Sequence, residues 1–376
     1  MSSGTPVIVG LSGGVDSAVA ALLLKRQGYD VAGLFMKNWE EDDGDGYCAA
    51  EEDYKEARRV CEILEIPLHA VNFASEYWDH VFSYFLAELH AGRTPNPDVL
   101  CNKEIKFKAF LEHAATLGAR YIATGHYARV VESDGAFRLL KARDSNKDQT
   151  YFLHALGQHE LARTLFPLGD LNKSEVRKIA REAGLPNHAR KDSTGICFIG
   201  ERNFRQFVAR YLPAQPGPMY TLAGAFKGQH QGLMYYTIGQ RHGLGLGGPG
   251  EAWYVVGKDV GRNALYIEQG TDNPALFAQS MSVATLNWIA GAAPNFPLSC
   301  GVKTRYRQPD QECIISPPCD GFSDVDFSIA QRAITPGQSA VFYRGDVCLG
   351  GGVIQAAPAH AGALPESSLP RQVNYY

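Results

Sequence analysis

The sequence predicts an α/β N-terminal domain with a doubly wound parallel sheet, followed by a small, mainly β central domain and a C-terminal β-barrel. From Pro6 to about Thr124, short β-branched runs alternate with longer helical ones, which is the pattern of a parallel sheet covered on both faces. From about Asp148 to Tyr211 the pattern is mostly helical. Beyond a proline-rich break at Pro213–Pro218, helical patterns give way to short strands separated by glycine, proline and Asn/Asp turns.

The N-terminal elements follow one another in a regular order. The expected elements are a strand at Val7–Val9, a helix at Val15–Gln27, a strand at Val31–Met36, a helix at about Ala49–Leu64, a strand at Leu68–Phe73, an amphipathic stretch at Ser75–Ala91, a helix from about Glu104 to Leu117 and a strand at Tyr121–Thr124. Ligands of such sheets bind beyond the carboxyl ends of the strands. The loops at Gly10–Ser17, Met36 onward and Gly125 should therefore meet at one site.

The C-terminal half is expected to be all β. Its clearest strands are Trp253–Val256, Ala264–Ile267, Gly301–Tyr306 and Ser339–Tyr343, with a break near Thr271–Pro274. The glycine-rich stretch Gly243–Gly250 precedes a strand-like W-Y-V-V, so it is expected to be a mobile loop rather than a dinucleotide motif, which must open a helix. We place domains at residues 1–205, 206–272 and 273–358. A tail at 359–376, rich in Ala, Pro and Ser, is expected to be weakly ordered.

Bulk composition constrains the partners and the location. The chain has 376 residues and a formal net charge of −4, so nucleic-acid binding must rest on local patches. Lys173–Arg210 is one such patch, with nine basic residues against four acidic ones, although solvated helix faces look alike. No apolar run approaches the roughly 20 residues of a membrane span, and Met1 onward lacks a basic start followed by an apolar stretch. We therefore expect a cytoplasmic protein without a membrane segment.

Residues Val7–Ser17 read V-I-V-G-L-S-G-G-V-D-S: an apolar strand, then glycines and capping residues where a helix begins. Backbone N–H groups and the helix dipole favour an anion at such a place. The segment lacks the lysine of a Walker A loop and the spacing of G-x-G-x-x-G. It resembles S-G-G-x-D-S, the signature of enzymes that split ATP into AMP and pyrophosphate. A plain glycine turn is the alternative interpretation.

The eight cysteines contain no C-x-x-C pair. This spacing argues against a zinc ribbon and, in a large cytosolic chain, against a disulfide framework. Cys61 and Cys348 lie in apolar or helical runs and are expected in the core. Cys313 and Cys319 are interpreted as structural.

Cys101 stands out because of its neighbours. It lies in the loop T-P-N-P-D-V-L-C-N-K-E, just before the helix expected near Glu104 and close to Lys103, and both features would lower the pKa of its thiol. Asp98 is a candidate proton acceptor. The alternative is a buried loop cysteine beside a capping acid.

Cys197 lies in K-D-S-T-G-I-C-F-I-G-E-R and has apolar neighbours, which by themselves favour a core thiol. Its pairing with Cys101 changes this interpretation. Two separated, loop-borne cysteines in an ATP-splitting chain suggest sulfur transfer, in which one thiol carries sulfane sulfur and the other releases it.

Several motifs in one order resemble the tRNA-specific 2-thiouridylases. They are G-L-S-G-G-V-D-S, F-M-K-N-W, G-R-T-P-N-P-D-V-L-C-N-K-E-I-K-F, A-T-G-H-Y-A-R, S-N-K-D-Q-T-Y-F-L, D-S-T-G-I-C-F-I-G-E-R, Q-G-L-M-Y-Y-T-I-G-Q-R, V-K-T-R-Y-R-Q and T-P-G-Q-S-A-V-F-Y, spread from about Val7 to Ile354. The resemblance implies an N-terminal domain like those of the adenine-nucleotide α-hydrolases. It also implies an enzyme that replaces the C2 oxygen of the wobble uridine of tRNA with sulfur. ATP would adenylate that oxygen, with Mg²⁺ neutralising phosphate charge.

The resemblance also assigns residues. It implies ATP binding by Gly10, Leu11, Ser12, Gly13, Gly14, Val15, Asp16, Ser17, Met36 and Gly125. It implies that Asn96, Pro97 and Asp98 hold the target base and that Asp98 accepts a proton. Cys197 would receive sulfur as a persulfide, and Cys101 would attack that persulfide or assist delivery, leaving a transient Cys101–Cys197 disulfide. Further tRNA contacts would come from His126, Lys147, Asp148, Gln149, Arg305, Tyr306 and Gln338.

The implied partners are the wobble-uridine tRNAs for Lys, Glu and Gln and a sulfur donor, either a cysteine desulfurase or a relay protein, acting on a monomer. Two alternatives stay open. Another ATP-pyrophosphatase, such as an amidotransferase-type or lysidine synthetase, would share the loop but would not need both thiols. A non-catalytic tRNA-binding relative would not need an intact Ser12, Asp16 and Asp98.

Overall fold

The N-terminal domain is built on a five-stranded parallel sheet. The computed structural model describes residues 4–40, 49–191 and 204–357. The sheet has the order β3-β2-β1-β4-β7, formed by β1 (Pro6–Gly10), β2 (Asp30–Lys37), β3 (Leu68–Asn72), β4 (Tyr121–Ala123) and β7 (Thr164–Leu165). The chain runs outward from β1 to β3 and then returns to the other side of β1 as β4. This reversal between β1 and β4 is where such sheets bind ligands.

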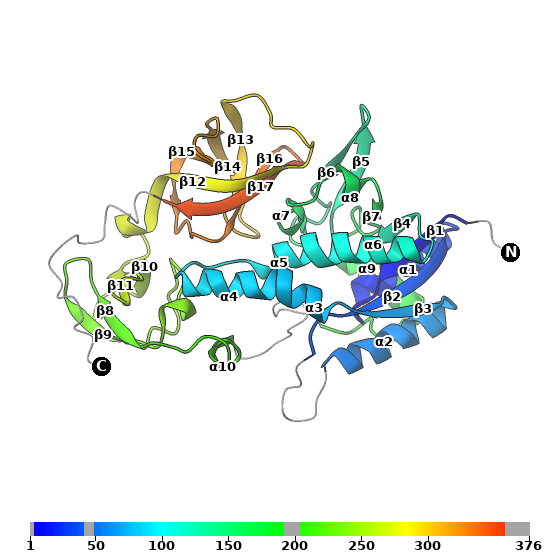
Figure 1. Ribbon diagram of the computed structural model, residues 1–376, viewed down its shortest axis with the longest axis horizontal. Helices are drawn as coiled ribbons and strands as arrows, with labels where there is room; N and C mark the ends of the chain where they lie inside the picture. Colours follow the sequence, from blue (N-terminus) through cyan, green and yellow to red (C-terminus); the bar gives the residue numbers. More distant parts are fainter. Residues whose placement is uncertain (1–3, 41–48, 192–203, 358–376) are drawn as a thin grey trace.

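Helices cover both faces of this sheet (Figure 1). The α-helices described up to residue 209 are α1 (Val15–Arg26), α2 (Ala49–Leu64), α3 (Ala74–Tyr77), α4 (Ser83–His90), α5 (Pro97–Leu100), α6 (Phe110–Thr116), α7 (Thr150–Leu153), α8 (Gln158–Leu161), α9 (Lys173–Glu182) and α10 (Phe204–Ala209), of which α10 lies away from this sheet. Two π-helical segments, η1 (Trp78–Phe82) and η2 (Cys101–Ala109), join α3 to α4 and α5 to α6. The result is two long helices that contact each other.

Alternation along β1 explains why its sequence is apolar throughout. Ile8 packs into one core with Phe110 and the other residues of the two long helices. Val7 and Val9 pack into the opposite core with α1 and α2. Because successive side chains of a strand point to opposite faces, a strand covered on both sides must be apolar at every position.

One expected helix begins earlier than the sequence pattern indicated. The helix expected near Glu104 starts at Pro97, so Asp98 and Cys101 lie within a helix and not in the loop before it. Asn96 caps this helix by accepting a hydrogen bond from the Asp98 N–H at 3.1 Å, and Pro97 occupies the first helical position. The two prolines indicated a rigid loop, whereas Asn followed by Pro is also the pattern of a helix start.

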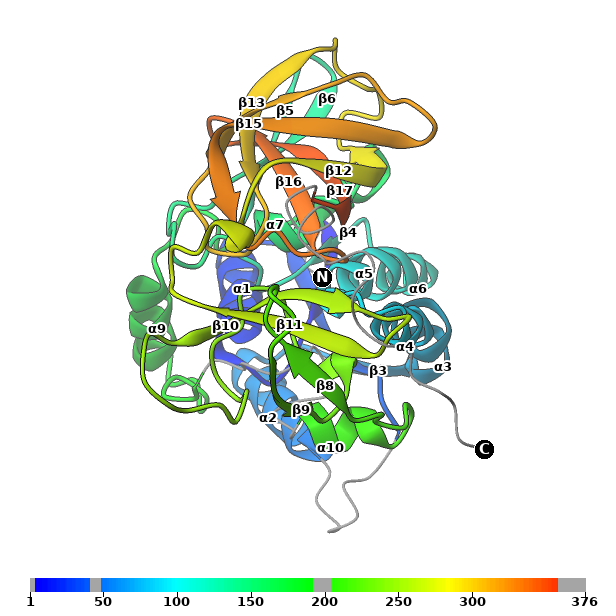
Figure 2. The same ribbon diagram turned by 90° about the vertical axis from the view of Figure 1, so that its left-hand side faces the viewer.

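The central part contains a four-stranded sheet of order β10-β11-β8-β9. Its strands are β8 (Gly217–Tyr220), β9 (Phe226–His230), β10 (Trp253–Asp259) and β11 (Ala264–Gln269), and the short 3₁₀ helix η3 (Leu233–Tyr235) follows β9. As expected, the Gly243–Gly250 stretch opens no helix and leads directly into β10. Figure 2 shows this sheet in front of the N-terminal domain and below the barrel.

The last part is a closed β-barrel. Its strands are β12 (Phe277–Trp288), β13 (Leu298–Lys303), β14 (Gln311–Ile315), β15 (Phe322–Arg332), β16 (Ser339–Arg344) and β17 (Val347–Ala356), with the 3₁₀ turn η4 (Pro274–Leu276) before them. They follow the order β12-β15-β14-β13-β16-β17, and pairing of β12 with β17 closes the barrel. β13 ends at Lys303, so the strand expected to reach Tyr306 is shorter, and Arg305 and Tyr306 lie in the turn after it.

A hairpin from the N-terminal domain extends the barrel sheet. β5 (Arg129–Ser133) and β6 (Ala136–Leu140) pair with each other, and β6 pairs with β17. No element was expected from the sequence pattern in this stretch. Cys61 and Cys348 are buried in cores as expected. Among the described helices, none combines the length and the apolar character needed to cross a membrane.

Candidate active site

The β1–α1 loop has the shape of an anion cradle. Gly13 has φ +73°, a left-handed conformation that favours glycine. Ser17 folds the loop onto the helix, since its hydroxyl donates to Gly14 O at 3.1 Å and accepts the Ser12 N–H at 3.3 Å. No side chain caps α1 at Gly14, which leaves N–H groups of the first turn available to an anionic ligand.

The three expected nucleotide-binding loops meet at this edge of the sheet. A Cβ atom added at Gly10 would lie 3.2 Å from Met36 Cε and 3.2 Å from Phe110 Cε1. One added at Gly125 would lie 2.6 Å from the Ser17 backbone nitrogen. Gly10 therefore lies against the Met36 side chain at the end of β2, and the backbone after β4 lies against the first turn of α1 at Gly125. The ends of β1, β2 and β4 thus form one site.

Asp16 carries the charge of the loop and is held from two sides. Lys173 Nζ lies 2.8 and 2.7 Å from its two carboxylate oxygens, and the Tyr127 hydroxyl donates to it at 2.9 Å. The Lys173 side chain is only 12 % exposed. The sequence pattern placed Lys173 in a basic patch for nucleic acid, but the structure places its ammonium beside the phosphate loop.

Gly13 is held by a second group of residues that the sequence did not single out. Asn187 Nδ2 and Arg190 Nη1 donate to Gly13 O at 3.0 and 3.3 Å. Arg190 also forms an ion pair with Asp53 at 2.6 Å. The only sequence signal for these residues was the positive charge of the Lys173–Arg210 segment.

Asp98 and Cys101 lie one helical turn apart, so they share a face of the α5–η2 helix. Cys101 is fully buried, whereas Asp98 is half-buried. Farther along this helix, Phe110 packs against Gly10 and so ties the helix to the phosphate loop. Cys101 is nine residues before Phe110, at the other end of the π-helical segment. Cys197, within residues 192–203, lies outside the described residues.

The π-helical turn begins at Cys101 itself. π-helical segments are rare and concentrate at functional sites. Next to the thiol, Asn102 Nδ2 donates to Phe152 O at 3.2 Å, while Asn102 Oδ1 is buried without a partner among the described residues. Asn102 thus connects η2 to α7.

The segment before α7 contains four of the expected tRNA contacts. His126 is 9 % exposed and its Nδ1 lies 2.9 Å from Thr124 Oγ1. Burial holds the pKa of His126 well below its usual value, so its ring is neutral. Asp148, 5 % exposed, accepts from the Ala142 N–H and from the Thr150 hydroxyl. These placements favour supporting roles for both side chains.

The other expected tRNA residues of this region, Lys147 and Gln149, are half-buried. Gln149 Oε1 accepts the Tyr127 N–H at 3.0 Å. Because Tyr127 also donates to Asp16, this contact connects the segment before α7 to the phosphate loop.

Residues of the barrel contact the loop before α5 and the helix α7. Gln338 Nε2 donates to Thr94 O at 2.7 Å, and the Thr94 N–H donates to Pro336 O at 2.9 Å. The Tyr306 ring lies 4.5 Å from that of Phe152. Arg305 is directed inward, where its Nη2 donates to Ala333 O at 2.7 Å and Ile238 O at 3.0 Å. The structure therefore brings the barrel, α7 and the start of α5 together.

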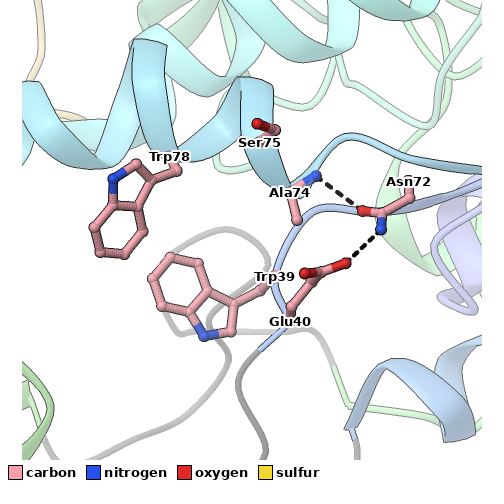
Figure 3. A pocket seen from close by; sticks show the side chains of 6 residues that line it. All are labelled: Trp39, Glu40, Asn72, Ala74, Ser75 and Trp78. Atoms are coloured by element: carbon pink, nitrogen blue, oxygen red, sulfur yellow. Dashed lines mark hydrogen bonds between the residues drawn. The ribbon is translucent and has the colours of Figure 1, made fainter.

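A cavity of about 360 Å³ lies at the ends of β2 and β3, on the same edge of the sheet. Figure 3 shows Trp39 and Trp78 on one side and Glu40 and Asn72 on the other. Asn72 donates to Glu40 at 2.6 Å and accepts the Ala74 N–H at 3.0 Å. The sequence pattern did not indicate this cavity.

Comparisons with known proteins agree with this architecture. A family model described as the tRNA methyl transferase HUP domain matches residues 5–201, that of the PRC-barrel domain matches 205–269, and an aminomethyltransferase β-barrel domain matches 278–354. A solved 4-thiouridine synthetase–RNA complex with bound ATP is similar at 16% identity and a TM-score of 0.34, covering 55% of this chain and 50% of that one. This likeness is too weak to bear on the fold or the chemistry.

Curated relatives are far more similar. The tRNA-specific 2-thiouridylase MnmA of Geobacillus thermodenitrificans is 60% identical over 93% of this chain and 94% of that protein. The protein of the same name from Nitrosomonas eutropha is 60% identical over 93% of this chain and 98% of that protein. The chain therefore belongs to the tRNA-specific 2-thiouridylase family.

Proposed function

We propose that this protein is an ATP-dependent tRNA-uridine 2-sulfurtransferase, which replaces the C2 oxygen of the wobble uridine with sulfur and releases AMP and pyrophosphate. One observation carries the proposal. The helix that carries Cys101 packs through Phe110 against Gly10 of a loop shaped for an anion, which supports the proposal that a thiol and a nucleotide act at one site. The names of relatives at 60% identity support it.

ATP would bind with its phosphates at Gly10–Ser17, while Met36 and Gly125 border the nucleotide. Lys173, Arg190 and the free N–H groups of α1 would offset the charge of the phosphates as pyrophosphate leaves. Transfer of AMP to the uridine C2 oxygen converts that oxygen into a good leaving group.

Asp16, in the first turn of α1, is the carboxylate of the loop that could bind Mg²⁺. Among the described residues there is no cluster of three His, Cys, Asp or Glu side chains suited to a metal. This fits Mg²⁺ bound mainly by phosphate oxygens, since Mg²⁺ usually takes one or two carboxylates and keeps several waters. When bound, the ion neutralises phosphate charge.

Sulfur transfer would use the two thiols. Cys197 receives a persulfide from a donor protein, either a cysteine desulfurase or a relay protein. The Cys101 thiolate attacks the inner sulfur of that persulfide, which forms the Cys101–Cys197 disulfide and releases the outer sulfur as a hydrosulfide equivalent. The sulfur then bonds to C2 as AMP departs, and two equivalents of an external thiol reduce the disulfide to the two cysteine thiols while they are themselves oxidised to a disulfide.

The base would be held at the start of α5 by Asn96, Pro97 and Asp98, with Asp98 as proton acceptor. The uridine must leave the anticodon stack to reach this position. We propose that tRNA is contacted by Lys147 and Gln149, which precede α7, and by Tyr306 and Gln338 of the barrel. His126, Asp148 and Arg305 would hold these contacts in place.

The test is direct. Protein is incubated with unmodified tRNA for Lys, Glu or Gln, ATP, Mg²⁺ and a persulfide donor, and 2-thiouridine is measured by mass spectrometry of digested tRNA. We expect product with the wild type and with Cys319→Ser, whose thiol is exposed. Cys101→Ser and Cys197→Ser should each abolish it.

The alternatives give different outcomes. Full activity in both Cys101→Ser and Cys197→Ser would exclude the two-thiol mechanism. Pyrophosphate release without thiolation, dependent on free lysine or ammonia, would indicate a lysidine-type or amidotransferase-type synthetase. Binding of tRNA without ATP consumption would indicate a non-catalytic relative.

A further inference from the structure

Two cysteines outside the proposed active site lie opposite each other on neighbouring strands of the barrel. Cys300 on β13 is the register partner of Cys313 on β14, in an antiparallel pair that runs from Leu298 opposite Ile315 to Val302 opposite Gln311. Their sulfur atoms lie 3.8 Å apart. The sequence grouped Cys313 with Cys319, but Cys319 lies beyond β14 and is exposed.

The geometry suits a disulfide. Directly opposed residues of antiparallel strands have Cα atoms about 4.5–5.5 Å apart, within the range of about 4.4–6.8 Å that a disulfide spans. The strands are already paired, so only side-chain rotation is needed to bring the sulfurs from van der Waals contact to bonding distance. The ladder on either side of the pair can stay as it is.

The two thiols differ in environment. Cys313 is 5 % exposed and belongs to the barrel core, whereas Cys300 is only partly buried. The hydrogen-bonding contact between the two sulfurs lowers the pKa of Cys300. Burial opposes this shift, the charge of Arg344 adds to it and the charge of Asp310 opposes it. Cys300, the more accessible of the two cysteines, is thus the one whose thiolate form is favoured. Cys313 is the buried thiol beside it.

We propose that Cys300 and Cys313 form a redox-active dithiol, which peroxide converts to a cross-strand disulfide. The Cys300 thiolate attacks hydrogen peroxide to give a sulfenic acid and, after protonation of the hydroxide, one water. Cys313 then attacks the sulfenic sulfur and a second water leaves. Two thiols and one peroxide thus give one disulfide and two waters.

Cys300 and Cys313 are separate from the thiols proposed for sulfur transfer. They lie, however, on the two strands that lead into and out of the turn with Arg305 and Tyr306, which we associate with tRNA binding. The β13–β14 hairpin carries Arg305 and Tyr306 in its turn, and Tyr306 packs on Phe152 of α7. Oxidation would join the two strands that hold this turn. The barrel should therefore resist unfolding more strongly when oxidised.

The experiment is peptide mapping of the full-length protein. Samples treated with stoichiometric hydrogen peroxide are alkylated, digested with trypsin without reduction and analysed by mass spectrometry. Residues 263–303 and 308–332 are the tryptic peptides that contain Cys300 and Cys313. We expect these two peptides cross-linked, and separated again by dithiothreitol. Cys319 is also in the second peptide, so the cross-link must persist in Cys319→Ser.

Two further samples complete the test. Cys300→Ser should lack the cross-link, and the peroxide-induced rise in the midpoint of thermal unfolding should be present in the wild type and Cys319→Ser but absent from Cys300→Ser. Since Cys300→Ser could perturb folding, the maps of the wild type and of Cys319→Ser together decide the proposal. It is overturned if oxidised wild type shows Cys300 and Cys313 both alkylated, or Cys300 oxidised to sulfinic acid, or the cross-link through Cys319.

Discussion

Lys173 Nζ lies within 2.8 Å of both carboxylate oxygens of Asp16, joining the first residue of α9 to the first turn of α1. The contact places a positive charge beside a loop whose backbone already favours anions. It also neutralises the carboxylate of Asp16, which would otherwise repel the ATP phosphates. Lys173 is therefore expected to act on ATP, although the sequence placed it in a patch for nucleic acid.

Replacement of this lysine tests that role. Lys173→Met should reduce kcat/KM for ATP by about 10- to 100-fold, because hydrogen bonds to charged groups contribute about 1.5–3 kcal/mol and 1.36 kcal/mol corresponds to tenfold. Lys178→Met is the matched control, since Lys178 lies on the same helix with its side chain 73 % exposed. Pyrophosphate release in the presence of tRNA is the measurement. Equal activity of the two variants would show that Lys173 does not act on ATP.

Gly125 tests the close approach of β4 to the phosphate loop. A Cβ at this position would lie 2.6 Å from the Ser17 nitrogen and 2.8 Å from the Asp16 carbonyl carbon, and these backbone atoms cannot move independently of α1. Gly125→Ala should lower the unfolding free energy by about 1–3 kcal/mol and raise KM for ATP. Gly247→Ala has open space and should change neither. Denaturant unfolding and initial rates at varied ATP concentration separate the two effects.

The sheet was predictable because β1 is apolar at every position and is followed by an unmistakable loop. Local sequence patterns predict such features. They did not predict the start of α5, because Asn96 and Pro97 suit both a rigid turn and a helix start. The contact that decides between the two is a single hydrogen bond, from the Asp98 N–H to the Asn96 side chain. The sequence also left β5 and β6 without an assignment: the two strands pair with each other, and the strand that β6 joins, β17, lies some 200 residues away.

The residues of the candidate site also fall into a group that the sequence could predict and a group that it could not. Gly10, Gly13 and Asp16 belong to one short motif whose chemistry is local. The Lys173 contact with Asp16, the Gln338 contact with Thr94 and the Cys300–Cys313 pair all join residues that only the fold brings together. Residue type suggests a possible role for each, but not the partner.

Asn96 has a capping role that can be separated from base binding. Its side chain satisfies the Asp98 N–H, so Asn96→Ala should lower the unfolding free energy by about 1 kcal/mol, whereas Asn96→Ser keeps a capping oxygen and most of that stability. If Asn96 also holds the uridine, both variants should lose thiolation. Denaturant unfolding and 2-thiouridine formation are measured on the same samples. Full thiolation by Asn96→Ser would leave capping as the role of Asn96.

Gln338 connects the barrel to the loop before α5. Gln338→Ala removes its donation to Thr94 O, and since a typical hydrogen bond contributes about 0.5–1.5 kcal/mol, kcat/KM for tRNA should fall about 2- to 10-fold. Gln355→Ala, on β17 of the same barrel, loses only a contact of 3.4 Å with Val353 O and should retain the wild-type value. The rate of ATP-dependent thiolation at varied tRNA concentration is the readout. A change in KM for ATP alone would contradict the expected effect.

His154 makes the junction between α7 and the barrel sensitive to acid. The side chain is 4 % exposed, its Nδ1 lies 2.8 Å from Tyr151 O, and a Cβ added to Gly351 of β17 would lie 2.6 Å from its ring. Burial, the largest cause, lowers the pKa of His154 to about 4, the Tyr151 carbonyl opposes this shift and the charge of Lys103 adds to it. The folded protein thus binds this proton less readily than the unfolded chain.

Because the unfolded chain takes up the proton first, this contribution to stability is complete above about pH 6.5 and is lost as pH falls from there toward 4. A shift of this size corresponds to about 3 kcal/mol. His154→Leu cannot titrate, so its unfolding free energy should fall less between pH 7 and pH 4.5 than that of the wild type, even if it starts lower because Tyr151 O loses its partner. His159→Leu, at an exposed histidine of α8, should retain the wild-type pH dependence. Parallel acid dependence in the wild type and His154→Leu would mean that another group controls the junction.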